Sequence, residues 1–292
     1  MNEANLLKIP HRCMLQIQAV YHSLKSAERK ATDFIVDHHA DIEDLTIVEL
    51  ASRAGCSEAT IVRLSKRLGY AGYPELKSDF ASNGERHNAD SFLEYQEIKR
   101  SDDPFQVFKK VFDASVAAMH DTLNVLDERS YLKAFEALCG AETIMFCGVG
   151  DAGLVALEAN QRFLRLGQRS EASVDYDIQL IMASHLRKGD VLVAVSHSGK
   201  TKNILQTVKT AAKAGATTIA ITNYPVSPLT KNSDIVLLTA VFSTSPTGEV
   251  ISKRITELCI IESLYINYLI RKGKPLIEKL RTSDRAVSIN KS

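Results

Sequence analysis

The chain has 292 residues, which at roughly 100–200 residues per domain is enough for two domains, and 45% of them are apolar. Its 36 basic and 35 acidic residues nearly cancel, so no global field attracts a polyanion and any nucleic-acid site must be a local patch. This composition excludes collagen-like and intrinsically disordered chains.

The sequence also excludes membrane, secreted and metal-cluster proteins. Its longest uncharged stretch, 214–230, contains two prolines and is too short and polar to span a bilayer. Residues 1–20 lack the apolar core of a signal peptide. The five cysteines are odd in number and widely spaced, as expected of reduced thiols. We therefore expect a cytoplasmic protein with no membrane partner and no metal ligands.

Residues 10–80 show apolar side chains at helical spacing and no strand pattern. Ser26 is a weak N-cap for one helix, because Glu28 stands one place too early for a capping box. Thr46 and Glu49 form a complete capping box for a helix over 47–54, which Gly55 ends. We expect an all-helical domain over residues 1–80.

Residues 46–69 are typical of a helix-turn-helix, whose second helix enters the major groove of DNA. Ser57 caps that helix, Gly69 ends it, and residues 53–77 contain five basic and two acidic side chains. Arg63 and Lys66 have the reach to contact guanine edges or phosphates. A helical oligomerisation domain with a basic surface is the alternative. The candidate DNA contacts are Ser57, Glu58, Thr60, Arg63, Lys66, Arg67 and Lys77.

The second half of the chain alternates between apolar strands and helical patterns. Residues 81–103 are polar and rich in turn formers, which predicts a linker, and Pro104 opens an amphipathic helix in a second domain over 104–285. Continuous apolar runs are typical of strands buried on both faces, so we expect an α/β domain with a five-stranded parallel sheet flanked by helices. The predicted strands are 143–147, 169–174, 191–196, 217–222 and 235–240.

Gly148, Gly150 and Gly153 form a G-x-G-x-x-G sequence between a strand and a helix. This context is typical of dinucleotide binding, and Glu171 or Asp175 lies about 20 residues further on, where a ribose-binding acid is expected. Both acids fall in a polar segment and not at the tip of an apolar strand, which weighs against that interpretation. A dinucleotide-binding redox sensor remains an alternative.

The segment Ser196–Thr201 (SHSGKT) follows a buried strand and opens a helix. Backbone N–H groups at a helix N-terminus attract anions, and the hydroxyls of Ser196, Ser198 and Thr201 add hydrogen-bond donors. Gly199 lets the backbone approach an anion closely. Together with the glycine loop, this segment predicts a site for a small phosphorylated ligand at the carboxyl ends of the strands.

Sugar-phosphate isomerisation requires a base and a group that assists ring opening. Glu249, His185 and His197 are candidates, but the sequence marks no pairing among them. We therefore predict no catalytic residue and a non-enzymatic protein, with a sugar-phosphate isomerase as the alternative function.

These motifs are familiar. Ser196–Thr201 resembles the phosphate loop of SIS (sugar isomerase) domains, and the N-terminal part resembles the RpiR family of bacterial transcriptional regulators in the segments 26–30, 57–63 and 68–77. The resemblance covers residues 20–280. It implies an N-terminal helix-turn-helix domain, an SIS domain, and a homodimer or homotetramer whose affinity for a double-stranded DNA operator is tuned by a sugar phosphate.

Two positions depart from the family pattern. Ala152 stands where a serine is common, preceded by Asp151, which repels phosphate but accepts hydrogen bonds from sugar hydroxyls or an amine. Lys253 stands where the family usually has serine; it could reach the ligand or face solvent, and the sequence favours solvent. The candidate effector residues are Gly148, Gly150, Asp151, Ser196, His197, Ser198, Gly199, Thr201, Glu249 and Lys253.

The combined prediction is a DNA-binding regulator, in function a repressor of a carbohydrate-metabolism operon, that responds to a phosphorylated sugar. It requires no cofactor, metal or membrane.

Overall fold

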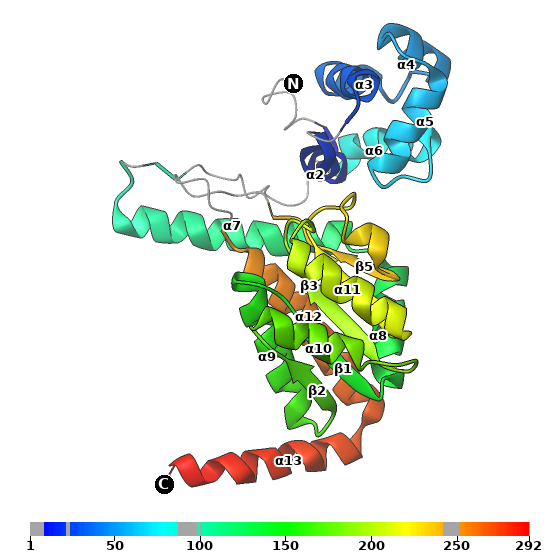
Figure 1. Ribbon diagram of the computed structural model, residues 1–292. Coiled ribbons are helices and arrows are strands. Elements are labelled where there is room, and N and C mark those ends of the chain that lie inside the picture. Colours follow the sequence, from blue (N-terminus) through cyan, green and yellow to red (C-terminus); the bar gives the residue numbers. More distant parts are fainter. Residues whose placement is uncertain (1–8, 22–23, 87–97, 100, 242–250, 292) are drawn as a thin grey trace. The chain divides into compact units, whose positions relative to one another are not determined.

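The computed structural model describes residues 9–21, 24–86, 98–99, 101–241 and 251–291 (Figure 1). The chain divides into two compact units, 1–94 and 95–292. None of the described helices combines the length and the apolar character needed to cross a membrane.

The first unit is helical, as predicted. The two strongest capping predictions are confirmed: the Glu49 carboxylate accepts a hydrogen bond from the Thr46 N–H (2.8 Å), and the Ser57 hydroxyl accepts one from the Thr60 N–H (3.2 Å). The helices are α2 (His11–Val20), α3 (Ser26–Asp37), α4 (Ile47–Arg53), α5 (Glu58–Arg67) and α6 (Tyr73–Arg86), with a short 3-10 turn, η2 (His39–Asp41).

Two local predictions in this unit differ from the structure. The N-cap of α3 is Lys25 and not Ser26, so Glu28 stands at the third helical position, where its carboxylate accepts from the Lys25 N–H (3.0 Å). Helix α6 continues to Arg86, into the segment predicted as linker. Tyr73 and Leu76 are buried in its first turn, and a helix anchored in this way gains one hydrogen bond for each residue it adds.

The second unit is an α/β fold in which all five predicted strands form, each ending within two residues of its predicted limit. The strands are β1 (Thr143–Cys147), β2 (Arg169–Ala172), β3 (Val191–Val195), β4 (Thr217–Thr222) and β5 (Ile235–Leu238). They pair in parallel in the order β2-β1-β3-β4-β5. Every residue of the central strand β3 is buried, as its apolar sequence predicts.

Helices cover both faces of this sheet. Residues of α8, α9, α12 and α13 pack against one face around Phe146 and Phe163, and residues of α10 and α11 pack against the other around Leu192. The helices are α7 (Pro104–Val125), α8 (Glu128–Gly140), α9 (Asp151–Arg165), α10 (Tyr176–Ser184), α11 (Lys202–Ala214), α12 (Lys253–Lys272) and α13 (Lys274–Ser288), with 3-10 turns η3 (Thr230–Asn232) and η4 (Ile289–Lys291).

Candidate DNA-binding and ligand-binding sites

Helix α5 has one buried and one exposed face. Ile61, Leu64 and Leu68, the residue that ends the helix, are fully buried in the helical unit, as predicted. Arg63 and Lys66 are exposed, and so are Ser57 and Glu58 at the helix N-terminus. The exposed face therefore offers two cations and a helix N-terminus, which are the groups that contact DNA bases and phosphates.

The structure gives three of the predicted DNA contacts other partners. Arg67 donates to the carboxylate of Glu28 at 2.8 Å, and Lys77 donates to the carbonyl oxygen of Leu45 at 3.0 Å. Thr60 is buried, with its hydroxyl 2.9 Å from that of Ser57. These contacts hold the helical unit together, and the prediction that the three side chains also contact DNA stays a prediction.

The Arg67–Glu28 pair makes a testable contribution to stability. Replacing Arg67 by alanine leaves the carboxylate of Glu28 buried without its cation, at an expected cost of about 3 kcal/mol in the free energy of unfolding of the helical unit. Urea unfolding followed by circular dichroism measures this loss. A Glu28→Gln/Arg67→Ala double variant should recover part of it, because no buried charge is left. Equal stability of Arg67→Ala and the wild type would contradict the assignment.

In the α/β unit, the chain reverses its direction of travel across the sheet between β1 and β3. In a sheet of this order, the carboxyl ends of those two strands flank the usual ligand crevice. A cavity of about 250 Å³ lies there. It is lined by Val149, Asp151, Ala152, Val195, Ser196, His197, Ser198, Thr201, Lys253 and Glu257.

The hydroxyl loop forms one wall of this cavity. Ser196 Oγ lies 3.3 Å from Thr201 Oγ1, and Ser198 Oγ accepts from the Lys200 N–H at 3.3 Å. Thr201 is the N-cap residue of α11, but its side chain makes no capping bond. Its hydroxyl and the first N–H groups of α11 are thus placed to bind an anion.

Gly199 is required by the shape of the loop. Its φ is +60°, a left-handed conformation, and a Cβ atom there would stand 2.3 Å from Ser227 Oγ. Glycine is therefore needed here for the loop to pack against Ser227, while the predicted close approach of its backbone to an anion stays a prediction.

The glycine loop is shaped for packing. A Cβ at Gly148 would lie 2.3 Å from the carbonyl oxygen of Ala152, so this residue allows the strand end to meet helix α9. The buried Gln179 side chain, which sequence reasoning missed, donates to the Gly148 carbonyl at 2.9 Å and fixes the loop from α10. Gly150, with φ +61°, is the N-cap of α9. Neither Gly148 nor Gly150 is among the residues that line the cavity.

Lys253 forms part of the cavity wall, so the interpretation that it faces solvent is wrong. Its Nζ lies 2.8 Å from the Asp151 carboxylate, and the hydrogen bond and charge of Lys253 lower the pKa of Asp151. Among the described residues that line the cavity, Lys253 is the only lysine or arginine. The residue before it, Ser252, is held to α7 by a 2.7 Å hydrogen bond between its hydroxyl and that of Ser115.

Glu257, one helical turn after Lys253, is the cavity residue that the sequence analysis missed. It is 1% exposed, its two carboxyl oxygens have no hydrogen-bond partner among the described residues, and burial raises its pKa to about 7. The same residues offer no partner to the two buried ring nitrogens of His197, and burial, with a contribution from Lys253, lowers the pKa of His197 to about 4. At neutral pH the cavity contains a neutral imidazole and a carboxyl group close to its midpoint of ionisation.

The other candidates that the structure describes do not line the cavity. Glu249 falls in 242–250, outside the described residues. His185 is exposed at the end of α10 and does not line the cavity. Of the two acids considered for a ribose, Asp175 caps α10 by accepting from the Ile178 N–H, and Glu171 is exposed on β2. Neither lies in the cavity wall, which weighs further against a dinucleotide.

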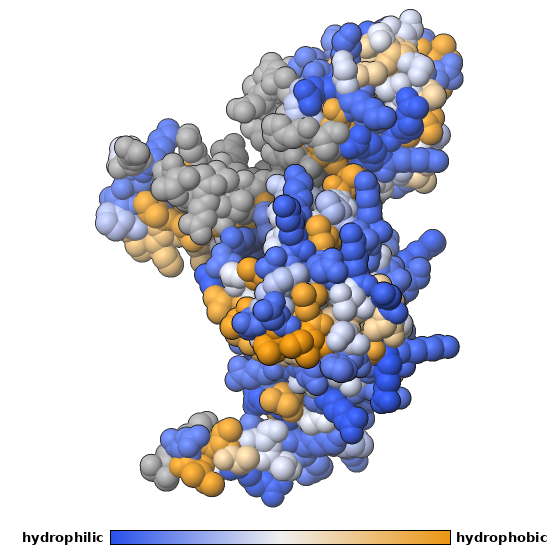
Figure 2. All heavy atoms as spheres, viewed as in Figure 1, coloured by the Kyte–Doolittle hydropathy of each residue, from blue (hydrophilic) through white to orange (hydrophobic). Residues whose placement is uncertain are grey.

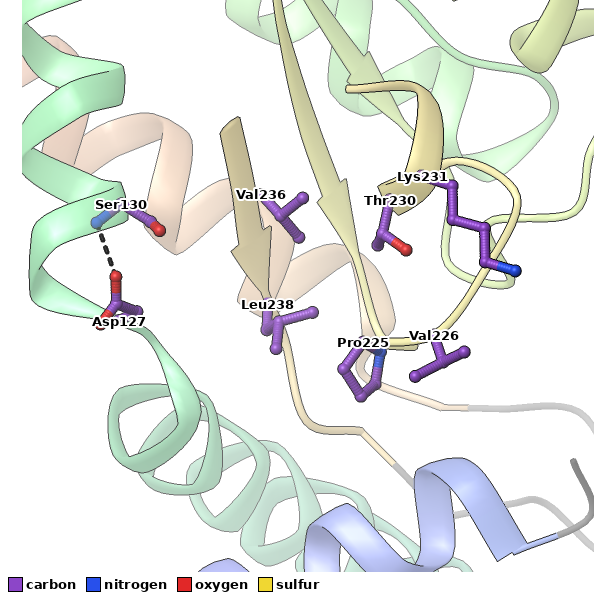
Figure 3. A pocket seen from close by; sticks show the side chains of 8 residues that line it. All are labelled: Asp127, Ser130, Pro225, Val226, Thr230, Lys231, Val236 and Leu238. Atoms are coloured by element: carbon purple, nitrogen blue, oxygen red, sulfur yellow. Dashed lines mark hydrogen bonds between the residues drawn. The ribbon is translucent and has the colours of Figure 1, made fainter. Parts of the chain in front are cut away.

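A larger cavity, of about 470 Å³, lies beside edge strand β5 (Figure 3). The Asp127 carboxylate in its wall accepts from the Ser130 N–H at 2.8 Å and so caps α8, as the dashed line in Figure 3 shows. Lys231 is the only basic residue among the described residues that line it, and none of the predicted ligand residues is there. The sequence motifs converge on the smaller cavity.

Comparisons with known proteins agree with this architecture. The model of the helix-turn-helix domain of the rpiR family matches residues 12–85, and the model of the SIS domain matches residues 137–266. An uncharacterized HTH-type transcriptional regulator of Caldanaerobacter subterraneus is 32% identical over 277 residues, which cover 94% of this chain and 96% of that protein. The HTH-type transcriptional regulator HexR of Pseudomonas aeruginosa is 28% identical over 92% of this chain and 94% of its own length.

The fold has a solved counterpart over nearly its full length. The structure of the Vibrio vulnificus NanR protein complexed with ManNAc-6P has a TM-score of 0.58 and 24% identity, and the match covers 94% of this chain and 97% of that one. The two family models confirm the predicted order of a helix-turn-helix domain and an SIS domain. The chain belongs to the rpiR family of helix-turn-helix transcriptional regulators.

Proposed function

We propose that this regulator is a cytoplasmic repressor of a carbohydrate-metabolism operon and that a phosphorylated sugar controls its affinity for the operator. The observation that carries the proposal is the cavity at the carboxyl ends of β1 and β3. Its wall contains the hydroxyls of Ser196, Ser198 and Thr201 at the N-terminus of α11, together with Lys253. The same chain carries a helix-turn-helix. The structure of NanR complexed with ManNAc-6P supports a phosphosugar in this fold.

The effector is oriented by the two sides of the cavity. Its phosphate binds at Ser196–Thr201, where helix N–H groups and hydroxyls stabilise an anion. Asp151 disfavours a phosphate on the opposite side, so the sugar moiety lies toward Asp151 and Lys253. Binding needs no cofactor or metal.

The operator is bound by a homodimer or a homotetramer in which two α5 helices enter successive major grooves about 34 Å apart. Apolar side chains that are exposed on α7 and α10 support this assembly (Figure 2). Phe105, Phe108 and Phe112 of α7 are each about 60% exposed, and apolar surface of this kind marks protein contacts. Sedimentation equilibrium of the full chain measures the assembly.

Helix α12 connects the cavity to α7. Lys253 lines the cavity, and its neighbour Ser252 bonds to Ser115 of α7, so a ligand that moves Lys253 also acts on α7. The chain continues from α7 through residues 87–103 to the helix-turn-helix. A tenfold effect on operator affinity requires a ligand that distinguishes the two states by about 1.4 kcal/mol.

A sugar-phosphate isomerase is the second candidate, and one observation favours it. Glu257 is buried in the wall of the cavity that His197 also lines, and its pKa of about 7 is suited to a general base. This function predicts turnover of a hexose or pentose phosphate that Glu257→Gln abolishes. Absence of turnover across a phosphosugar panel would exclude it.

A thermal-shift screen tests the proposed function. The panel contains glucose 6-phosphate, mannose 6-phosphate, fructose 6-phosphate, glucosamine 6-phosphate and ribose 5-phosphate, each with its free sugar, together with NAD(P). A ligand at 100 times its dissociation constant adds about 2.7 kcal/mol of stability. Stabilisation by a sugar phosphate and not by its free sugar is expected, whereas stabilisation by NAD(P) alone would favour the redox-sensor alternative.

A further inference from the structure

Glu257 is a buried acceptor group that lines the cavity. It is 1% exposed, and within the described part of the chain neither of its carboxyl oxygens has a hydrogen-bond partner. Leaving a buried charged group without partners is costly, and native proteins seldom do so without a functional reason. The partner is therefore expected to come from a ligand.

The neighbouring side chains do not supply this partner. Lys253 Nζ is bonded to Asp151 at 2.8 Å, and the His197 nitrogens make no hydrogen bond to the carboxyl group. The charges that act on Glu257 are those of Lys253 and Arg254 in its own helix and Asp151 at the start of α9, and the neutral His197 completes the cavity wall after β3. The carboxyl groups of Asp151 and Glu257 thus share this side of the cavity with one lysine, Lys253, which leaves more hydrogen-bond acceptors than donors there.

We infer that Glu257 binds hydrogen-bond donors of the effector's sugar, hydroxyl or amine, in its ionised form, so that effector binding releases a proton. This inference rests on the proposed function and adds the residue that recognises the sugar. The phosphate binds on the hydroxyl loop, and Glu257 on α12 recognises the donors carried by the rest of the molecule.

The sign of the pH dependence follows from the state of Glu257. Burial holds its pKa at about 7 without ligand, so the carboxyl group is mostly protonated near pH 6 and mostly ionised near pH 8. Donors from the sugar stabilise the ionised form and lower the pKa in the complex. Affinity therefore rises with pH, by about tenfold from pH 6 to pH 8 if only the ionised form binds. A ligand that presented an acceptor instead would bind more weakly as the pH rises.

Glu257→Gln separates this effect from the ionisation of the ligand. The second pKa of a phosphate monoester is about 6, so part of the pH dependence belongs to the phosphate and persists in the variant. Isothermal titration calorimetry at pH 6, 7 and 8 uses the tightest-binding of the five sugar phosphates in the panel. From pH 6 to pH 8 we expect the affinity of the wild type to rise about tenfold more than the affinity of Glu257→Gln.

Two further measurements do not depend on the variant. Titration of the wild type at pH 7 in buffers of different ionisation enthalpy measures the proton release, for which we expect about half a proton from Glu257 beyond about 0.1 proton from the phosphate. Comparison of glucosamine 6-phosphate with glucose 6-phosphate, which differ by an amine in place of a hydroxyl, shows which donor the carboxylate prefers.

Equal pH dependence in the wild type and Glu257→Gln, or proton uptake by the wild type, would overturn the inference and leave sugar-phosphate control intact. If none of the five sugar phosphates binds, the proposed function fails and the inference fails with it.

Discussion

Replacing Gly199 by alanine is expected to weaken effector binding by more than tenfold. A Cβ atom at this position would stand 2.3 Å from Ser227 Oγ, at a φ of +60° that L-residues seldom adopt, so the hydroxyl loop must change its path. Ser196, Ser198 and Thr201 then no longer converge on one anion. Isothermal titration calorimetry with the tightest-binding sugar phosphate measures the loss.

Gly189→Ala is the matched control. Gly189 also has a positive φ, +98°, but a Cβ there meets no atom within 4 Å, so the variant carries comparable backbone strain away from the loop. Its effector affinity should equal that of the wild type once both proteins are shown to be folded. Equal losses in the two variants would attribute the effect to general destabilisation, and unchanged binding in Gly199→Ala would contradict the role of the loop.

Replacing Arg63 by alanine is expected to weaken operator binding by about 1–3 kcal/mol if its guanidinium contacts a base. Arg63 lies on the exposed face of α5, where its guanidinium donates to the Thr60 hydroxyl at 3.2 Å. Effector affinity should be unchanged, because the cavity belongs to the other unit. Fluorescence anisotropy with an operator fragment selected by the protein from a random DNA library measures the change.

Alanine variants of Lys66 and Lys30 show whether the effect of Arg63→Ala on operator binding is specific to a base contact. Lys66→Ala should weaken binding to all sequences alike and lower the salt dependence by about one phosphate contact. Lys30→Ala removes the same charge from the exposed surface of α3, outside the helix-turn-helix, and should have little effect. If Arg63→Ala and Lys30→Ala bind the operator equally, α5 is not the recognition helix.

Much of the fold was predictable because its signals are local. The capping groups at Thr46 and Ser57 act within three residues, and the apolar run of β3 is buried over its whole length. The two ligand loops follow strands whose carboxyl ends meet at one edge of the sheet, so their proximity followed from the alternation of strands and helices.

The features of the two sites that the sequence could not show depend on long-range partners. Arg67 pairs with a carboxylate 39 residues away, and Lys77 bonds to a carbonyl 32 residues away, so their basic character alone suggested DNA contacts. Lys253 reaches the cavity because α12 packs beside α9, where Asp151 begins the helix. Glu257 had one usable signal, its position one turn after Lys253, but its burial is a property of the packed helices.

If one chain couples a phosphosugar cavity to an operator-binding helix, the effector must change operator affinity. Fluorescence anisotropy measures the operator affinity of the wild-type protein without ligand and with a saturating concentration of the sugar phosphate that binds most tightly. We expect at least a tenfold change in the dissociation constant, equivalent to about 1.4 kcal/mol of coupling. Saturation of the cavity with no change in operator affinity would contradict it.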